Sequence, residues 1–152
     1  MHIFSQFGFQ KITVDEIAKA AHKAKGTVYY YFKNKKELFQ SVVEKEFSTF
    51  RRELIKAVEE GETGKMKLTN YITTWMKVPG ELSNMYEALK NEYLSYLGFK
   101  EAIGEKYDTE EVTLVKSVLV AGMKNGEFEK KDKDQTVFVI VRAKKDLKYQ
   151  YL

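Results

Sequence analysis

One short segment of the chain combines the residue types that contact nucleic acid. Lys25, Gly26, Thr27, Tyr29 and Tyr30 supply a cation, a hydroxyl, two phenols and a residue without a side chain. Ammonium, hydroxyl and phenol groups hydrogen-bond to phosphates and to base edges in the major groove of DNA. A side chain at the glycine would hold the backbone away from a duplex. The chemistry that this segment suggests is DNA recognition.

The positive charge of the chain is concentrated around this segment. Residues 1–36 contain seven lysines against two acids, a local charge of +5, which leaves −1 for the rest of a chain with a net charge of +4. A basic patch raises the local concentration of a polyanion such as nucleic acid. Charge alone leaves a solvated, lysine-rich surface equally open. The lysines are Lys11, Lys19, Lys23, Lys25, Lys33, Lys35 and Lys36.

Groups suited to catalysis or metal binding are scarce. The chain has no cysteine, and its two histidines are His2 and His22. The glycine-containing stretch 61–65 lacks the spacing of a phosphate-binding loop. Glu110 and Glu111 are expected on a solvated helix end, where acids are common. We therefore expect no enzyme activity, no catalytic residue, no metal site and no cofactor.

Nothing in the chain predicts a membrane segment or a secretory signal. No run approaches the roughly 18 apolar residues that cross a bilayer. The chain starts without a basic segment followed by a long apolar stretch. The absence of cysteine fits a reducing compartment. The expected location is the cytoplasm.

The element before the basic segment is predicted to be a short amphipathic helix. Thr13 can cap its start, and Glu16 completes a capping box. Ile17, Ala18 and Ala21 continue an apolar stripe at helical spacing, and the small alanines permit close approach of another helix.

A second short helix is predicted over Lys25–Phe32, after a tight turn. Val28, Tyr31 and Phe32 fall at helical spacing and are expected to face the core, which turns the other side chains outward. Two short helices joined by such a turn match the helix-turn-helix plan.

A third helix is predicted to start at Asn34, with Glu37 at the box position. Lys35 and Lys36 lie in its first turn, where the helix dipole disfavours cations. A bound phosphate would reverse that penalty.

These segments together resemble the DNA-binding domain of the TetR family of bacterial regulators, over about residues 3–47. The resemblance is carried by Thr13-Val-Asp-Glu-Ile-Ala-Lys-Ala-Ala, Lys25-Gly-Thr-Val-Tyr-Tyr-Tyr-Phe and Asn34-Lys-Lys-Glu-Leu-Phe. It implies that Lys25, Gly26, Thr27 and Tyr29 face the major groove of a double-stranded operator. It also implies that Thr13, Tyr30 and Lys35 hold phosphates, and that Val28, Tyr31 and Phe32 lie in the core.

The turn and the chain ends depart from the family pattern. His22, Lys23 and Ala24 stand where the family usually has a glycine, an aliphatic residue and a serine. Ala24 cannot cap the second helix, at a cost of roughly 1 kcal/mol, and His22 is expected to take an unfavourable positive φ. Lys23 could add a phosphate contact. The family's first helix begins before Met1, so the first helix is expected to be truncated, and the charged C-terminal helix suggests a second incomplete end.

The remaining sequence predicts further helices and an all-α fold. Gly98 and Gly104 predict an irregular stretch over 98–108, after which Asp108 and Glu111 form a capping box. The β-branched run 137–141 could form a strand but has no partner strand, so we expect a buried helix there. A helix-turn-helix domain is predicted over 1–47, and a helical effector-binding and dimerisation domain over 48–152. The predicted helices are 38–58, 66–78, 81–96, 109–125 and 134–150.

The resemblance implies a homodimer joined through the last two helices and a small-molecule effector in the body. Tyr71, Trp75, Tyr86 and Tyr93 are candidate ligand-binding residues, although plain core packing with amphipathic surface tyrosines is the favoured explanation of them. The function expected is an effector-responsive repressor on a pseudo-palindromic operator. The resemblance also implies a bacterial cytoplasm as its location, on the nucleoid when the protein is bound to DNA. The alternative is a constitutive or chromosome-associated DNA-binding protein without an effector.

Overall fold

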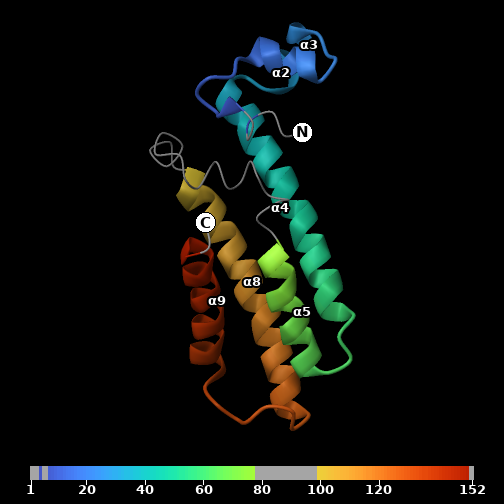
Figure 1. Ribbon diagram of the computed structural model, residues 1–152, viewed down its shortest axis with the longest axis vertical. Coiled ribbons are helices and arrows are strands. Elements are labelled where there is room, and N and C mark those ends of the chain that lie inside the picture. Colours follow the sequence, from blue (N-terminus) through green and yellow to red (C-terminus); the bar gives the residue numbers. More distant parts are fainter. Residues whose placement is uncertain (1–3, 5–6, 78–98, 151–152) are drawn as a thin grey trace. The chain divides into compact units, whose positions relative to one another are not determined.

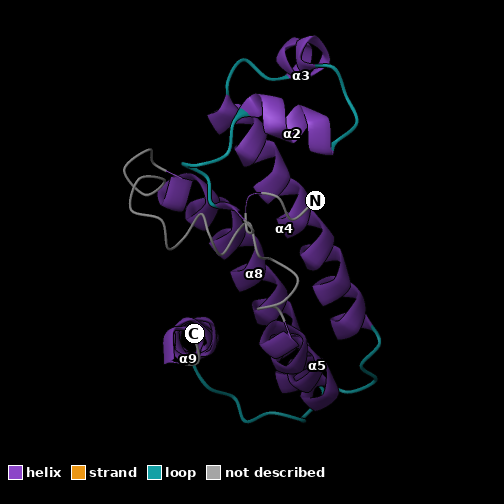
Figure 2. Ribbon diagram, turned by 45° about the horizontal axis from the view of Figure 1, so that its top comes forward, coloured by secondary structure: helices purple, strands orange, loops and turns teal. Residues whose placement is uncertain are grey.

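All elements that the structure describes are α-helices, as Figure 2 shows. The computed structural model describes residues 4, 7–77 and 99–150, with side chains for residues 4, 7–77 and 109–143. The predicted all-α fold is confirmed. Within these ranges no helix is both long and apolar enough to cross a bilayer.

The chain divides into two compact units. The first contains Met1–Phe50 and Val78–Ile103, and the second contains Arg51–Lys77 and Gly104–Leu152. Helix α4 (Lys35–Glu59) contributes to both units, because the division falls after Phe50.

In the first unit, α2 (Val14–Ala20) and α3 (Lys25–Tyr31) pack beside the start of α4 (Figure 1). Three aromatic rings form the centre of the core. The ring centroid of Phe39 lies 4.7 Å from that of Phe4 and 5.0 Å from that of Phe9. Edge-on packing at these distances is favourable for aromatic rings. The other buried apolar residues of the unit include Ile12, Ile17, Ala18, Val28, Leu38 and Val43.

Local capping signals set the boundaries of these helices, as the sequence predicted. The Thr13 hydroxyl accepts the Glu16 amide, and the Glu16 carboxylate accepts the Thr13 amide at 2.7 Å. The Asn34 side chain accepts the Glu37 amide at 2.8 Å, and the Glu37 carboxylate reaches back to the Lys33 amide. Each arrangement satisfies amides that a helix start leaves without intrahelical partners.

The second unit is built from the end of α4, α5 (Gly64–Lys77), α8 (Phe99–Lys124) and α9 (Lys133–Gln150). Polar contacts join the helices. The Asn70 amide donates to the Ala57 carbonyl at 2.8 Å, and Arg51 pairs with Glu110 at 2.8 Å. The apolar core between them comprises Leu54, Val58, Tyr71, Val115, Val118, Leu119, Val137 and Val141.

A loop closes one end of this unit against two glycines. A Cβ on Gly122 would lie 2.3 Å from the Phe128 ring, and one on Gly64 would lie 3.0 Å from it. Both positions therefore need glycine because the ring covers them. The Glu127 carboxylate accepts the Gly64 amide at 2.6 Å and so caps α5. Gly126, with φ 77°, ends α8 as the sequence predicted.

The expected break at residues 98–108 was wrong. Helix α8 runs without interruption through Gly104, and Asp108 lies in its interior. A glycine in a helix costs only about 1 kcal/mol, which the packing of a long helix offsets. Glu111 consequently makes no cap and faces the core.

The run 137–141 is helical, as expected, but only one side of it is buried. Val137 and Val141 are in the core, whereas Phe138 is 65% exposed and Val139 is 61% exposed. A helix has about 3.6 residues per turn, so five consecutive side chains point all the way around it. A continuous apolar run therefore cannot lie wholly against one neighbouring helix. The helix predicted over 81–96 lies outside the described residues.

Candidate DNA interface

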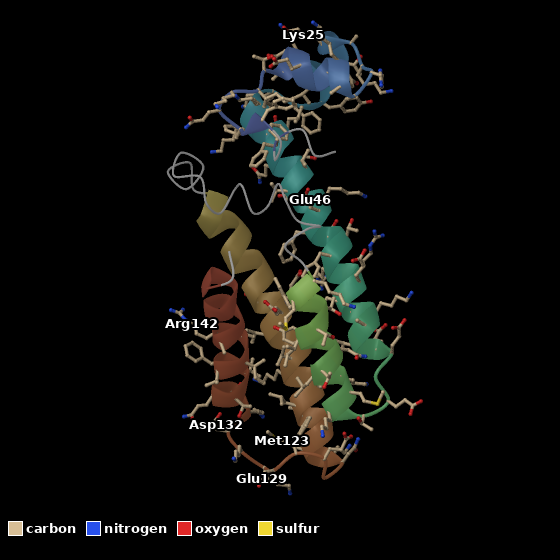
Figure 3. The ribbon with its side chains drawn as sticks, viewed as in Figure 1. Lys25, Glu46, Met123, Glu129, Asp132 and Arg142 are labelled. Carbon is tan, nitrogen blue, oxygen red and sulfur yellow. The ribbon has the colours of Figure 1, made fainter. Side chains whose placement is uncertain are left out.

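Most of the surface of α3 has no role in the core of the protein. Val28 is its buried residue, at 8% exposure. Tyr29 and Tyr30 are 46% and 82% exposed, and the Lys25 side chain projects outward in Figure 3. A Cβ built on Gly26 would meet no atom within 4 Å. The five α3 residues that sequence analysis assigned to DNA are therefore all exposed.

Tyr31 does not lie in the core, contrary to expectation. It is 69% exposed, and its ring packs edge-on against Tyr30 at 5.0 Å. The helix ends at Tyr31, and Phe32 leaves it with φ −132° and ψ 119°. With only seven residues, α3 turns a single narrow row toward its neighbours. Val28 and the half-buried Phe32 occupy that row.

The turn between α2 and α3 has the strained residue that the sequence predicted. His22 adopts φ 53°, the left-handed region that favours glycine. Its amide donates to the Lys19 carbonyl at 3.0 Å, and the Lys23 amide donates to the Ala18 carbonyl at 2.9 Å. This pair of bonds is the Schellman arrangement that ends many helices. The end of α2 therefore keeps both hydrogen bonds of this arrangement, although the positive φ of His22 is unfavourable for a residue other than glycine.

Thr13 is exposed at the start of α2, and its hydroxyl is shared with the capping box. The hydroxyl donates to the Glu16 carboxylate at 2.7 Å and accepts the Glu16 amide at 3.3 Å. Hydrogen bonds to the Glu16 carboxylate from the Thr13 amide, and then from its hydroxyl, hold the pKa of Glu16 below its ordinary value. A phosphate at Thr13 would have to compete with that carboxylate for the hydroxyl proton.

Lys35 is held by the protein itself. Its ammonium donates to the carbonyl oxygens of Gln10 at 3.3 Å and Ile12 at 2.9 Å, and it lies 4.7 Å from the centroid of the Phe9 ring. Partial burial lowers the pKa of Lys35. An ammonium has three donors, so a third remains for a phosphate. Lys35 therefore anchors the segment before α2 to the start of α4, a role that its sequence position did not indicate.

Comparison with known proteins agrees with this geometry. The family profile described as bacterial regulatory proteins, tetR family, matches residues 1–42. These 42 residues belong to the TetR family of bacterial regulatory proteins. An uncharacterized HTH-type transcriptional regulator of Bacillus subtilis, YhgD, is 26% identical over 91% of this chain and 73% of its own length. This chain is accordingly a TetR-type transcriptional regulator.

Solved structures share the fold. The fatty acid degradation regulator FadR from Bacillus halodurans superposes with a TM-score of 0.71 at 23% identity, over 94% of this chain and 74% of that one. AibR, solved in complex with isovaleryl coenzyme A and operator DNA, superposes with a TM-score of 0.63 at 16% identity, over 91% of this chain and 76% of that one.

This TetR-family turn lacks the cap that a serine would supply. Ala24 has the extended backbone of an N-cap residue, with φ −68° and ψ 145°, but no side-chain hydrogen bond. We expect Ala24→Ser to raise the free energy of unfolding by about 1 kcal/mol, because its hydroxyl can accept an α3 amide. Chemical denaturation measures the gain. Ala24→Val, which adds no acceptor, should give none, and equal gains from both variants would contradict this explanation.

Of the four candidate ligand residues of the body, the structure describes Tyr71 and Trp75, both on α5. Tyr71 is 1% exposed, and its hydroxyl donates to the Glu111 carboxylate. Trp75 is half-buried one turn later on α5. Tyr86 and Tyr93 lie outside the described residues.

Sequence analysis missed the buried pair of Tyr71 and Glu111. Glu111 was expected on a solvated helix end, yet it is 9% exposed. The available signal was spacing, since Glu111 precedes Val115 and Leu119 at steps of four on the buried row of α8. Among the side chains described, no group of three acids or histidines gathers as a metal site.

Proposed function

We propose that the chain is an effector-responsive repressor that binds a pseudo-palindromic operator as a homodimer. The exposed face of α3 carries this proposal. On this face the side chains of Lys25, Tyr29 and Tyr30 are exposed to solvent. Gly26 lies among them and lowers helix stability, yet no neighbouring atom within 4 Å of a Cβ requires a glycine there. In a dimer, two such helices would enter successive major grooves about one helical turn apart. Residues 1–47 would bind DNA, and residues 48–152 would dimerise and receive the effector.

A strip on α8 and α9 supports dimerisation. Lys116 of α8 pairs with Asp134 of α9 at 2.5 Å. Val112 and Val120 lie one turn on either side of Lys116, and Phe138 lies one turn after Asp134, so all three flank the ion pair on one face. They are 37%, 43% and 65% exposed, respectively. Apolar residues in a row across two helices are the kind of surface that a second copy covers.

The effector is proposed to be an acyl thioester or a related fatty acid derivative. The support is the similarity to FadR, a fatty acid degradation regulator, and to AibR, which was solved with isovaleryl coenzyme A. Such an effector would weaken DNA binding by favouring a different spacing of the two recognition helices.

Selection of duplexes from a randomised DNA pool tests the DNA-binding proposal. We expect the selected sequences to converge on an inverted repeat, bound less tightly as salt rises because lysine–phosphate contacts release counterions. Absence of binding to any duplex at low salt would overturn it. Release of the selected duplex by acyl thioesters of increasing chain length then tests the effector. If the body binds none of them in calorimetry, this effector class is wrong, and a constitutive DNA-binding protein becomes the better description.

Two variants separate base recognition from phosphate binding. Tyr29→Ala is expected to relax sequence preference, since it removes a group that faces base edges. Lys35→Ala is expected to weaken binding to all sequences alike and to lower the salt slope by about 0.9, the value for one phosphate contact. Affinities for the selected duplex and for random duplexes give both quantities. Equal, sequence-independent losses from the two variants would contradict the role given to Tyr29.

Because Lys35 also bonds to the carbonyls of Gln10 and Ile12, its variant needs a stability control. The free energy of unfolding is measured in parallel, and DNA binding is compared at a temperature where both proteins are folded. A change in stability without a change in salt slope would assign Lys35 to anchoring alone.

A further inference from the structure

An ion pair links the two helices of the helix-turn-helix at the DNA-facing surface. The Lys25 ammonium donates to the Asp15 carboxylate at 2.9 Å, and the two side chains are 57% and 49% exposed. Asp15 lies in the first turn of α2, and Lys25 is the first residue of α3. The pair therefore places a negative charge beside the recognition helix, where phosphates would approach.

Asp15 is the acid whose position needs an explanation. Residues 1–36 contain two acids, Asp15 and Glu16. Glu16 completes the capping box with Thr13, which explains its presence. An acid in the first turn of a helix is favoured by the helix dipole, but Asp15 also engages the cation of the neighbouring helix.

The pair changes what Lys25 can do on DNA. A lysine whose charge is balanced at 2.9 Å contributes little net attraction to the phosphate backbone, which supplies most non-specific binding. The hydrogen bond that Lys25 donates to the Asp15 carboxylate raises the pKa of Lys25. Its nitrogen lies 5.9 Å from the centroid of the Tyr29 ring. One donor is used by Asp15, and the others remain for acceptors on a base edge.

We propose that Asp15 is a positioning residue for sequence specificity, acting through Lys25. It restrains the lysine beside Tyr29 as an oriented hydrogen-bond donor and suppresses its use as a phosphate-seeking cation. This inference rests on the proposed function of α3 as the recognition helix. It adds that a carboxylate of the supporting helix α2 sets the ratio between specific and random binding.

Asp15→Asn tests the proposal in the full chain, because it removes the charge and keeps the shape. We expect binding to random-sequence duplexes to become about threefold tighter and the salt slope to steepen by about 0.9, as for one added phosphate contact. Affinity for the duplex selected by the unmodified protein should not rise, so the specificity ratio falls about threefold. A change in helix stability alone would not move the salt slope.

Two matched variants show whether the effect passes through Lys25. Glu16→Gln removes the same charge from the same helical turn, and glutamine can still complete the capping box. Glu16→Gln should change the salt slope much less than Asp15→Asn, because the Glu16 carboxylate of the unmodified protein is bonded to Thr13 and not to Lys25. In a Lys25→Met background, Asp15→Asn should leave the slope unchanged.

Each contrary outcome is distinct. Equal effects from Asp15→Asn and Glu16→Gln, or an Asp15→Asn effect that persists without Lys25, would overturn the proposal in favour of general charge. An equal gain on selected and random duplexes would overturn it as well. If the unmodified protein selects no sequence at all, the proposed function fails instead, and random-duplex binding and its salt slope still report whether Asp15 restrains Lys25.

Discussion

Replacing Gly26 with alanine is expected to strengthen the fold and weaken operator binding in the same molecule. The position is helical, and an added Cβ meets nothing within 4 Å. Alanine is favoured over glycine in a helix by roughly 0.5–1 kcal/mol, so the free energy of unfolding should rise by about that amount. Chemical denaturation of the two proteins measures the difference.

The same methyl group points to where the duplex would lie. Inserting a group into a close-packed contact costs about 1–3 kcal/mol, so affinity for the selected operator should fall about fivefold or more. Titration of a labelled duplex measures the loss. A matched control is Thr113→Ala, an exposed position of α8, which should affect stability without changing affinity. If Gly26→Ala gains stability and keeps full operator affinity, α3 does not approach DNA at this residue.

Phe138→Glu is expected to convert the proposed homodimer into a folded monomer. Phe138 is 65% exposed, so its loss should cost the monomer little, while a carboxylate in an apolar interface would lose its hydration without a partner. Loss of the second recognition helix removes the gain from bivalent binding, which reaches about a hundredfold or more. Analytical ultracentrifugation and operator titration measure the two effects.

Ala143→Glu places the same charge on another side of α9, where the residue is also exposed. It should remain dimeric with unchanged operator affinity. A Phe138→Glu protein that still sediments as a dimer would exclude the strip beside the Lys116–Asp134 pair as the interface, without bearing on the role of α3.

The parts of the molecule that followed from sequence are those governed by neighbours along the chain. The Thr13 capping box, the helix end at Gly126 and the positive φ of His22 all depend on bonds that span a few residues. The uncapped start of α3 at Ala24 was predicted for the same reason. The candidate residues for DNA contact were also predictable, because helical spacing assigns Val28 to the core and leaves the polar and charged residues of α3 outside it.

Burial required the tertiary structure. Spacing placed Tyr31 in the core, yet α3 is too short to turn two rows inward. Glu111 resembled a surface acid, and only the approach of Tyr71 from α5 gives its carboxylate a buried donor. Phe138 lies on the exposed side of an apolar run whose other side, at Val137 and Val141, is buried.

By itself, the sequence determined the helical fold, the helix ends of the first unit and the candidate residues for DNA contact, because each depends on short-range hydrogen bonding and periodicity. Only the tertiary structure decided that Lys25 is paired with Asp15, that Lys35 is held by two carbonyls, and that Glu111 is buried. These contacts join residues that are separated along the chain by a turn or by whole helices. Short-range sequence patterns do not indicate which of these groups come together, because their meeting depends on how the helices pack.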